Sequence, residues 1–129
     1  MKKLLAFLLC FLAVPAFAAA PIGTPIPSIQ SGAAESSHVL KATPGLLNGF
    51  SASSGATSGD VMIFDATTAP SDGAVTPKFC YALPASQTTG ASWVEYPVYF
   101  VNGIVIVFSS TGCFTKTASA TAFFTAQVQ

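Results

Sequence analysis

With 129 residues, the chain is long enough for one domain and too short for two, because domains cluster near about 100 to 150 residues. Only 8% of the residues are charged while 51% are hydrophobic, so little charge opposes association, and we expect the protein to bind itself or another surface. The basic residues are all lysines, and the lack of arginine, together with the balanced charge, argues against nucleic acid as a partner.

The first segment, MKKLLAFLLCFLAVPAFAAA, predicts a signal peptide over residues 1–18, with cleavage after Ala18 or Ala20. An uncleaved membrane anchor is the less favoured alternative, because the apolar run Leu4–Val14 falls short of the roughly 20 residues that span a bilayer. A lipoprotein is also disfavoured, since bulky residues precede Cys10. We therefore expect export to the periplasm, the cell surface or the medium, with no stable transmembrane span after cleavage.

Residues 19–37 are rich in proline, glycine and serine, and they predict a semi-extended segment that passes into a flexible tether. An alternative is an arm that docks on a neighbouring subunit through Ile22, Ile26 and Ile29. A fimbrial subunit completed by a donated strand fits less well, because prolines interrupt the alternation that such a strand needs.

From His38 to the C-terminus, short apolar runs alternate with turn-forming residues, and no useful helical periodicity is present. This pattern predicts one all-β domain over residues 38–129, an antiparallel β-sandwich of the Greek-key or jelly-roll type. The expected strands are Val39–Ala42, Leu46–Ser53, Val61–Asp65, Lys78–Leu83, Ala91–Glu95, Val98–Val101, Ile104–Ser109 and Ala120–Val128.

Ile104–Phe108 is apolar at every position, which predicts a strand covered on both faces, with Ala120–Val128 as its antiparallel return. Val61–Phe64 is continuous in the same way and should also be central. The long connection Asp65–Lys78 suits a passage between sheets. Asn102-Gly103 allows either a hairpin or a bend, and we favour the bend.

Removal of the leader leaves Cys80 and Cys113, and two cysteines in an exported chain favour a disulfide. The alternative is one buried cysteine on a strand and a separate cysteine in a loop. A metal site is disfavoured, because no CxxC and no paired histidine accompany them.

No catalytic constellation stands out in this sequence, so we expect no enzyme activity, no cofactor and no metal. His38 is the only histidine and therefore the only imidazole base available. Gly55–Gly59 lacks the strand-to-helix setting of a nucleophile elbow and predicts a turn. Asp65 and Asp72 could bracket a calcium ion, but capping of loops by aspartate is the more common role.

Trp93, Tyr96 and Tyr99 form the one aromatic cluster that suggests a binding site. Exposed on a sheet, such rings offer flat amphipathic surfaces to a sugar or a protein, whereas core packing is the expected role of at least one of them.

The segments VMIFDATTAPSDGAVTP (61–77) and GIVIVFSSTGCFTKTASATAFFTAQV (103–128) resemble a family of small, poorly characterised proteins encoded by tailed phages and prophages. The resemblance implies a β-sandwich that accompanies virions as a decoration or fibre-like subunit. The leader departs from that pattern, since tailed-phage particles assemble in the cytoplasm. We therefore expect a non-enzymatic structural or surface-display protein, associated with a virion or exported to the envelope; the alternative is a secreted module that binds glycans or proteins.

Overall fold

The computed structural model describes residues 25–129, and all regular secondary structure in this range is β-strand. The predicted signal peptide, its cleavage sites and the first residues of the tether lie outside the described residues. Within residues 25–129 no helix has the length and hydropathy needed to cross a membrane. The strands are β1 (Ser28–Gln30), β2 (Ser37–Lys41), β3 (Gly45–Ser54), β4 (Gly59–Asp65), β5 (Gly73–Ala74), β6 (Phe79–Leu83), β7 (Thr88–Ser92), β8 (Val98–Phe100), β9 (Ile104–Ser109), β10 (Thr115–Lys116) and β11 (Ala122–Val128).

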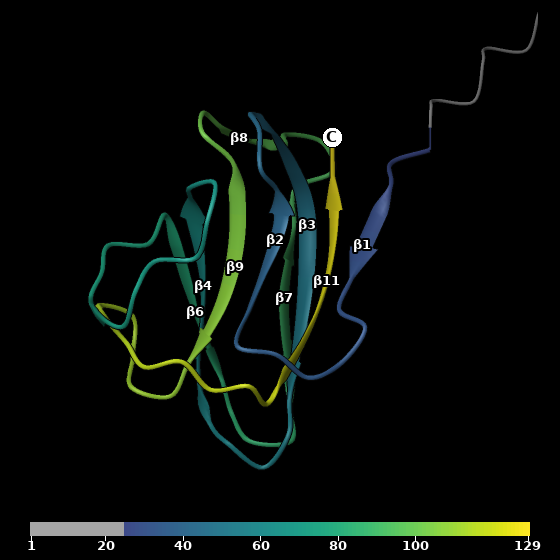
Figure 1. Ribbon diagram of the computed structural model, residues 1–129. Coiled ribbons are helices and arrows are strands. Elements are labelled where there is room, and N and C mark those ends of the chain that lie inside the picture. Colours follow the sequence, from purple (N-terminus) through teal and green to yellow (C-terminus); the bar gives the residue numbers. More distant parts are fainter. Residues whose placement is uncertain (1–24) are drawn as a thin grey trace, which may run out of the picture.

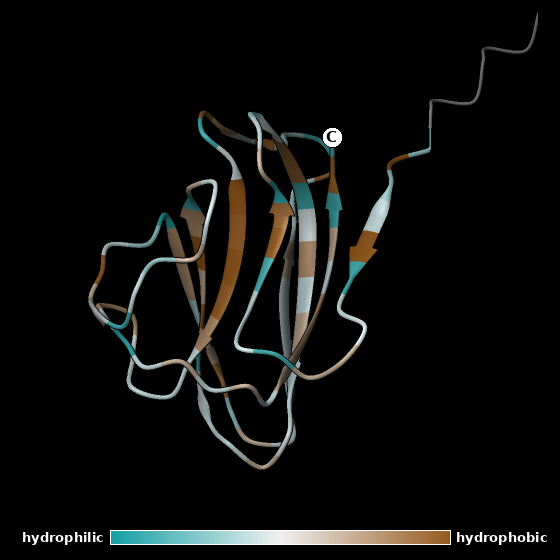
Figure 2. Ribbon diagram, viewed as in Figure 1, coloured by the Kyte–Doolittle hydropathy of each residue, from teal (hydrophilic) through white to brown (hydrophobic). Residues whose placement is uncertain are grey.

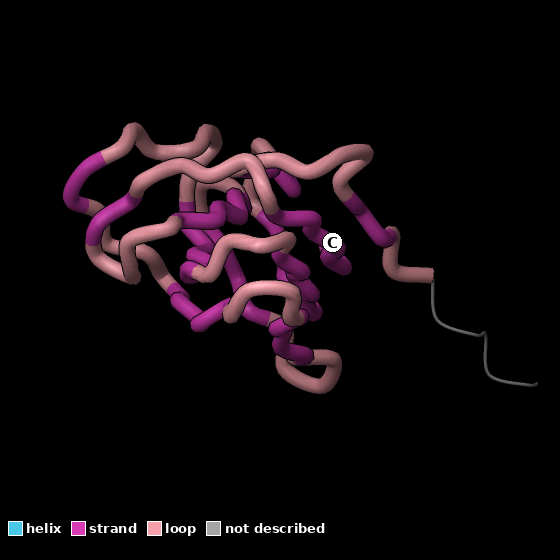
Figure 3. The backbone as a smooth tube through the Cα atoms, turned by 90° about the horizontal axis from the view of Figure 1, so that it is seen from below, coloured by secondary structure: helices cyan, strands magenta, loops and turns pink. Residues whose placement is uncertain are grey.

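The strands form two antiparallel sheets that pack face to face, as Figures 1 and 3 show, which confirms the predicted β-sandwich. Sheet A has the order β1-β11-β3-β7, and β8 also pairs with β3. Sheet B has the order β2-β9-β4-β6. A separate two-stranded ribbon joins β5 and β10.

The core between the sheets takes apolar side chains from both of them, and the strongly hydrophobic strands lie inside the molecule in Figure 2. Phe100, Phe108 and Phe124 are its largest fully buried side chains. Burying one such ring contributes about 1.5 to 3 kcal/mol relative to leaving it exposed. These three rings come from β8 and β11 of sheet A and from β9 of sheet B, so the core joins the two sheets.

Strand β9 is buried at every position, as its continuous apolar run predicts. Ile104, Ile106 and Phe108 join the core between the sheets. Val105 and Val107 instead join a second apolar cluster with Met62 and Phe64 of β4; the cover of this cluster includes Ala66, Ala69, Val75 and Cys80. The outer face of sheet B is therefore covered by the connection between β4 and β6, which acts as a third layer.

Two predicted connections are wrong. Strands β9 and β11 are not partners: β9 pairs with β2 and β4, whereas β11 pairs with β1 and β3 in the other sheet. The burial of β11 alternates strictly, which fits a strand with one covered face, unlike β9. The connection 66–78 does not pass between sheets, because β4 and β6 are neighbours in sheet B; it instead folds over the apolar outer face of that sheet.

The bend at Asn102-Gly103 is present, since β8 pairs with β3 and β9 pairs with β4, so these two strands form no hairpin. The chain crosses here from sheet A to sheet B. A Cβ atom at Gly103 would lie 2.6 Å from the carbonyl oxygen of Ala66 and 2.7 Å from that of Lys41. Glycine is required at this position by the close approach of two other backbone segments.

Part of the segment interpreted as a tether is ordered on sheet A. Ser28, Ile29 and Gln30 form β1, which pairs antiparallel with β11 along the edge of the sheet (Figure 1). Ile29 is partly buried against the main core. The first strand of the folded domain therefore precedes His38, inside the proline-rich stretch.

Candidate functional site

The three predicted aromatic residues lie where one edge of sheet A is interrupted. Strands β7 and β8 pair with the same edge of β3: Ser92 is the partner of Gly49 and Val98 is the partner of Leu47. Residues 93–97 have only Asn48 opposite them, so they leave the ladder as a loop. The amide of Trp93 donates to the carbonyl oxygen of Asn48 over 2.6 Å and fixes the start of this loop.

Trp93 is half-buried and belongs mainly to the core. Its ring centroid lies 5.3 Å from that of Phe79 and 6.1 Å from that of Phe50, and Phe50 in turn lies 5.2 Å from Tyr81. Such offset ring pairs contribute about 0.5 to 1.5 kcal/mol beyond their buried area. Trp93 therefore anchors loop 93–97 by packing against Phe50 of sheet A and Phe79 of sheet B.

The residues that follow Trp93 turn outward. Tyr96 is 84% exposed and Tyr99 is 55% exposed, and two valines that sequence reasoning missed, Val94 and Val101, are 62% and 60% exposed. We call Val94, Tyr96, Tyr99 and Val101 the end patch. Eight consecutive residues thus place four large hydrophobic side chains in solvent. Exposed hydrophobic side chains that are grouped together often mark an interaction site.

A hollow of about 370 Å³ adjoins the end patch and is lined by Ser92–Tyr96. It brings together Trp93 and Tyr96, two of the three predicted site residues, with Glu95 as its acidic group. Tyr99 lies outside this lining, on β8. The arrangement offers one partly buried ring, one exposed ring and a carboxylate, which can contact a ligand by stacking and by hydrogen bonds.

Polar contacts hold the backbone around the end patch. The Asp65 carboxylate accepts hydrogen bonds from the amides of Val101, Asn102 and Gly103, at 3.0, 2.7 and 3.4 Å. Desolvation raises the pKa of Asp65, but these three donors and the charge of Lys78 outweigh it and hold that pKa below its ordinary value. The turn after β8 is therefore anchored to the end of β4.

Lys78 fixes the other side of the same turn. Its ammonium group donates to the carbonyl oxygen of Tyr99 over 2.6 Å and lies 4.4 Å from the centroid of the Phe100 ring. A cation over an aromatic face contributes about 0.5 to 1 kcal/mol at an exposed position. The end patch thus sits on a backbone that is positioned before any partner binds.

A second surface feature lies on the outer face of sheet A. A shallow groove of about 230 Å³ crosses four strands there, with Gly49 in its lining. Ser28, Gln127, Gly49 and Ser92 are register partners in one row across β1, β11, β3 and β7. The exposed side chains of the groove are all small or neutral: Ser28, Ser51, Ser92, Thr125 and Gln127.

The predicted disulfide is confirmed: Cys80 of β6 is bonded to Cys113, which follows β9. The Asp60 carboxylate lies 3.7 Å from the sulfur of Cys113 and 4.0 Å from that of Cys80, and burial raises its pKa. These three residues are grouped closely enough to hold a metal ion, but both sulfurs are used by the disulfide. Only the Asp60 carboxylate is then left as a ligand, so the group does not fit a metal.

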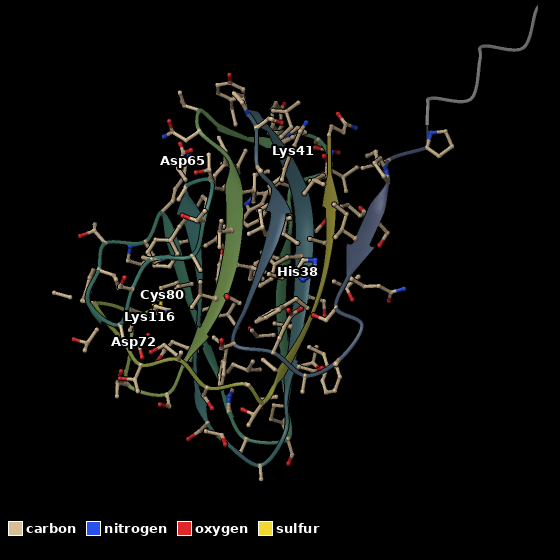
Figure 4. All side chains as sticks on the ribbon, in the orientation of Figure 1. His38, Lys41, Asp65, Asp72, Cys80 and Lys116 are labelled. Carbon is tan, nitrogen blue, oxygen red and sulfur yellow. A yellow bond between two sulfur atoms is a disulfide. The ribbon has the colours of Figure 1, made fainter. Side chains whose placement is uncertain are left out.

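His38 lies on β2 and has an acidic partner, since its Nδ1 is 2.8 Å from Oε1 of Glu35. Figure 4 shows it on a different part of the molecule from Cys80 and Asp72. Neither of the two hollows described above includes His38 or Glu35 in its lining. A base and an orienting acid are therefore present, without a serine, threonine or cysteine nucleophile among the hydrogen-bond partners of His38 in residues 25–129.

Asp65 and Asp72 do not converge on one ion site. Asp65 caps the turn after β8, whereas Asp72 accepts hydrogen bonds from Nζ of Lys116 at 2.5 Å and from the amide of Ala118 at 3.1 Å. The Lys116 side chain, followed by the Ala118 amide, lowers the pKa of Asp72. Asp72 thus ties the layer over sheet B to β10, as loop-capping aspartates do.

The described residues form an all-β sandwich with one intrachain disulfide. A disulfide is compatible with an exported protein. No family model, no curated protein and no solved structure matches the chain. The resemblance to tailed-phage proteins and the predicted export therefore stay predictions.

Proposed function

We propose that this protein is a non-enzymatic structural or surface-display subunit, exported to the envelope or associated with a phage virion, and that it acts by contact through the end patch. The observation that carries the proposal is the exposure of Val94, Tyr96, Tyr99 and Val101 on a backbone held by Asp65 and Lys78. Large apolar side chains that are held in place and left in solvent are typical of surfaces that bind a partner.

The low charge of the chain supports the same function. Only 8% of its residues are charged, and the exposed lining of the groove on sheet A is neutral. Such a surface offers little electrostatic repulsion to a neighbouring copy. A disulfide that closes the layer over sheet B suits a subunit that must persist outside the cell.

The proposal is tested with the exported full chain and a variant in which Tyr96→Ser and Tyr99→Ser are combined. Both tyrosines are exposed, so the variant should keep its melting temperature within a few degrees. We expect the original chain to co-sediment with envelopes or virions of its source and the variant to be lost from them. Equal recovery of both proteins, or absence of both from every particle fraction, would contradict the proposal.

A second candidate function is a secreted module that binds glycans or proteins through the same end of the sandwich. The hollow beside Trp93 and Tyr96 favours it, because an aromatic ring beside a carboxylate is a surface on which a sugar can stack and form hydrogen bonds. It differs from the first candidate in requiring a defined soluble ligand.

Glycan-array screening separates the two functions. A binding module should give a signal that Tyr96→Ala removes while the matched exposed substitution Phe114→Ala, at a residue 71% exposed and outside the hollow, leaves it intact. Equal signals from both variants would exclude this site, and silence on the array with retained particle association would favour the structural subunit.

A further inference from the structure

Strand β11 lacks the features that usually protect the edge of a sheet. Its sequence, AFFTAQV, contains no charged residue and no proline. Its alternate residues Ala122, Phe124, Ala126 and Val128 are buried in the main core, so the strand cannot turn its edge away without opening that core. An uncharged edge of this kind is a template for another strand.

Strand β1 provides the cover that this edge needs. Its ladder with β11 pairs Ser28 with Gln127 and Gln30 with Thr125. The pairing extends at both ends: the amide of Val128 donates to the carbonyl oxygen of Pro27, and the amide of Ser31 donates to that of Phe124 over 2.8 Å. The Ser31 hydroxyl also accepts a hydrogen bond from the amide of Phe124 over 2.9 Å.

Apart from its ladder with β11, β1 makes few contacts with its own chain. Ser28 and Gln30 are exposed, and Ile29 alone among the strand residues is partly buried. The connection that follows, Gly32-Ala33-Ala34, is exposed throughout, and nothing lies within 4 Å of a Cβ placed on Gly32. Beyond it, the amide of Glu35 returns to the carbonyl oxygen of Ala122. The strand is thus bounded by a short link that makes few contacts.

We propose that β1 is an exchangeable strand, which in the assembled protein leaves its own β11 and pairs with β11 of a second copy. The inference rests on the proposed function as a structural subunit and names the contact that joins its copies. The hydrogen bonds and the Ile29 contact are the same within one chain and between two chains. The equilibrium between pairing within one chain and pairing between two chains is therefore set by the length of the link and by the concentration of neighbouring copies.

The length of the link determines the concentration of neighbouring copies above which exchange between chains is favoured over pairing within one chain. A short flexible link gives the chain's own strand an effective concentration in the millimolar range. Exchange is then a minor event in dilute solution and becomes dominant where copies are crowded on a surface. Each exchanged contact joins the donor strand of one copy to the acceptor edge of another. Exchange can therefore close reciprocally into a dimer, or continue from copy to copy into a ring or a filament.

Paired cysteine substitutions test the exchange in the full chain. Ser28 and Gln127 are opposite each other in the ladder, and both line the outer groove, so their side chains share one face. A chain with Ser28→Cys and a differently tagged chain with Gln127→Cys are mixed at high concentration under mild oxidation. Neither can form this cross-link within itself, so we expect a covalent dimer that carries both tags.

The matched control replaces Gln127→Cys by Thr125→Cys, which lies on the same face but opposite Gln30. This mixture should give little mixed dimer, because the two cysteines are out of register. Mixed dimers of equal yield in both mixtures would reflect random collision and would overturn the exchange, as would no mixed dimer in either.

A third variant carries Ser28→Cys and Gln127→Cys in one chain and is oxidised in dilute solution, which locks β1 on its own β11. Light scattering from micromolar to millimolar concentration should show the unmodified chain growing in mass and the locked chain remaining a monomer. If both grow alike, β1 exchange is wrong while self-association stands. If the unmodified chain stays monomeric and no mixed dimer forms, both the exchange and the self-association fail.

Discussion

Replacement of the disulfide by Cys80→Ala and Cys113→Ala should destabilise the domain strongly. The bond joins residues separated by 33 positions in the sequence. In the chain-entropy model, a closed loop of this length stabilises the folded state by about 3.7 kcal/mol at 25 °C through its constraint on the unfolded chain. For a domain of this size, 1 kcal/mol shifts the melting temperature by roughly 4 to 8 °C, so a loss of about 15 to 30 °C is expected.

The structure also predicts where the damage is first visible. The bond holds the loop after β9 against β6, and Cys80 packs on the cluster of Met62, Phe64, Val105 and Val107. Without the bond, this outer layer should open at temperatures below global unfolding, because it is then held mainly by the short β5–β10 ribbon and by the hydrogen bonds of Asp72. Binding of a hydrophobic dye during thermal melting reports that exposure.

Calorimetry of the oxidised chain and the double alanine variant measures the total effect. A neighbouring loop substitution, Ser110→Ala, serves as control and should change little, since Ser110 is exposed. A loss of less than about 5 °C for the double variant would mean that removal of the bond gives the unfolded chain little additional freedom, contrary to the chain-entropy model.

Three further predictions follow from the packing and the charges. Phe124→Ala should cost about 3 to 5 kcal/mol in chemical denaturation, whereas Thr125→Ala, on the exposed face of the same strand, should stay within about 0.5 kcal/mol; similar losses would mean that the assignment of faces is wrong. Gly103→Ala should cost about 1 to 3 kcal/mol, because its Cβ would lie under 3.0 Å from two carbonyl oxygens, and an unchanged melting temperature would contradict that crowding. Lys116 lowers the pKa of Asp72 from 3.8 in the folded state, so the stability that this carboxylate contributes is present above pH 3.8 and is lost as the pH falls through the lowered value. In Asp72→Asn, the free energy of unfolding should therefore fall less steeply at acid pH than in the original chain. An equally steep fall would count against a stabilising Asp72–Lys116 ion pair.

Much of the fold follows from hydrophobic patterning. The runs Val61–Phe64 and Ile104–Phe108 are apolar at successive positions, and both strands are central, with cover on both faces. Their partners could not be predicted, because a run without alternation does not indicate which face belongs to which layer. The alternating burial of β11 shows that one of its faces is covered, but it does not show which sheet the strand belongs to. Its place in sheet A is known only from its partners β1 and β3.

The cover of sheet B illustrates the same limit. A strand with two apolar faces requires two covers, and the sequence indicated that requirement without indicating its source. The sequence predicts that the connection after β4 crosses between the sheets, but its Ala66, Ala69 and Val75 pack on the outer cluster instead. These small side chains carry too weak an apolar signal to be recognised as a layer from composition alone.

The candidate site was found in part. Three aromatic residues in close succession predicted a surface, and two of them, Tyr96 and Tyr99, are exposed while Trp93 packs on Phe50 and Phe79. Val94 was missed because an isolated valine within a strand pattern normally signals burial. The loop at 93–97 arises from the way β7 and β8 share one edge of β3, which is a tertiary arrangement.

Radical footprinting of the full chain, in dilute solution and in its particle-bound or assembled state, measures directly whether the end patch is the contact surface. We expect Tyr96 and Tyr99 to be labelled strongly in the free protein and to be protected in the bound protein, while labelling of half-buried Tyr81 stays constant. Equal labelling of Tyr96 and Tyr99 in the two states would contradict that role of the end patch.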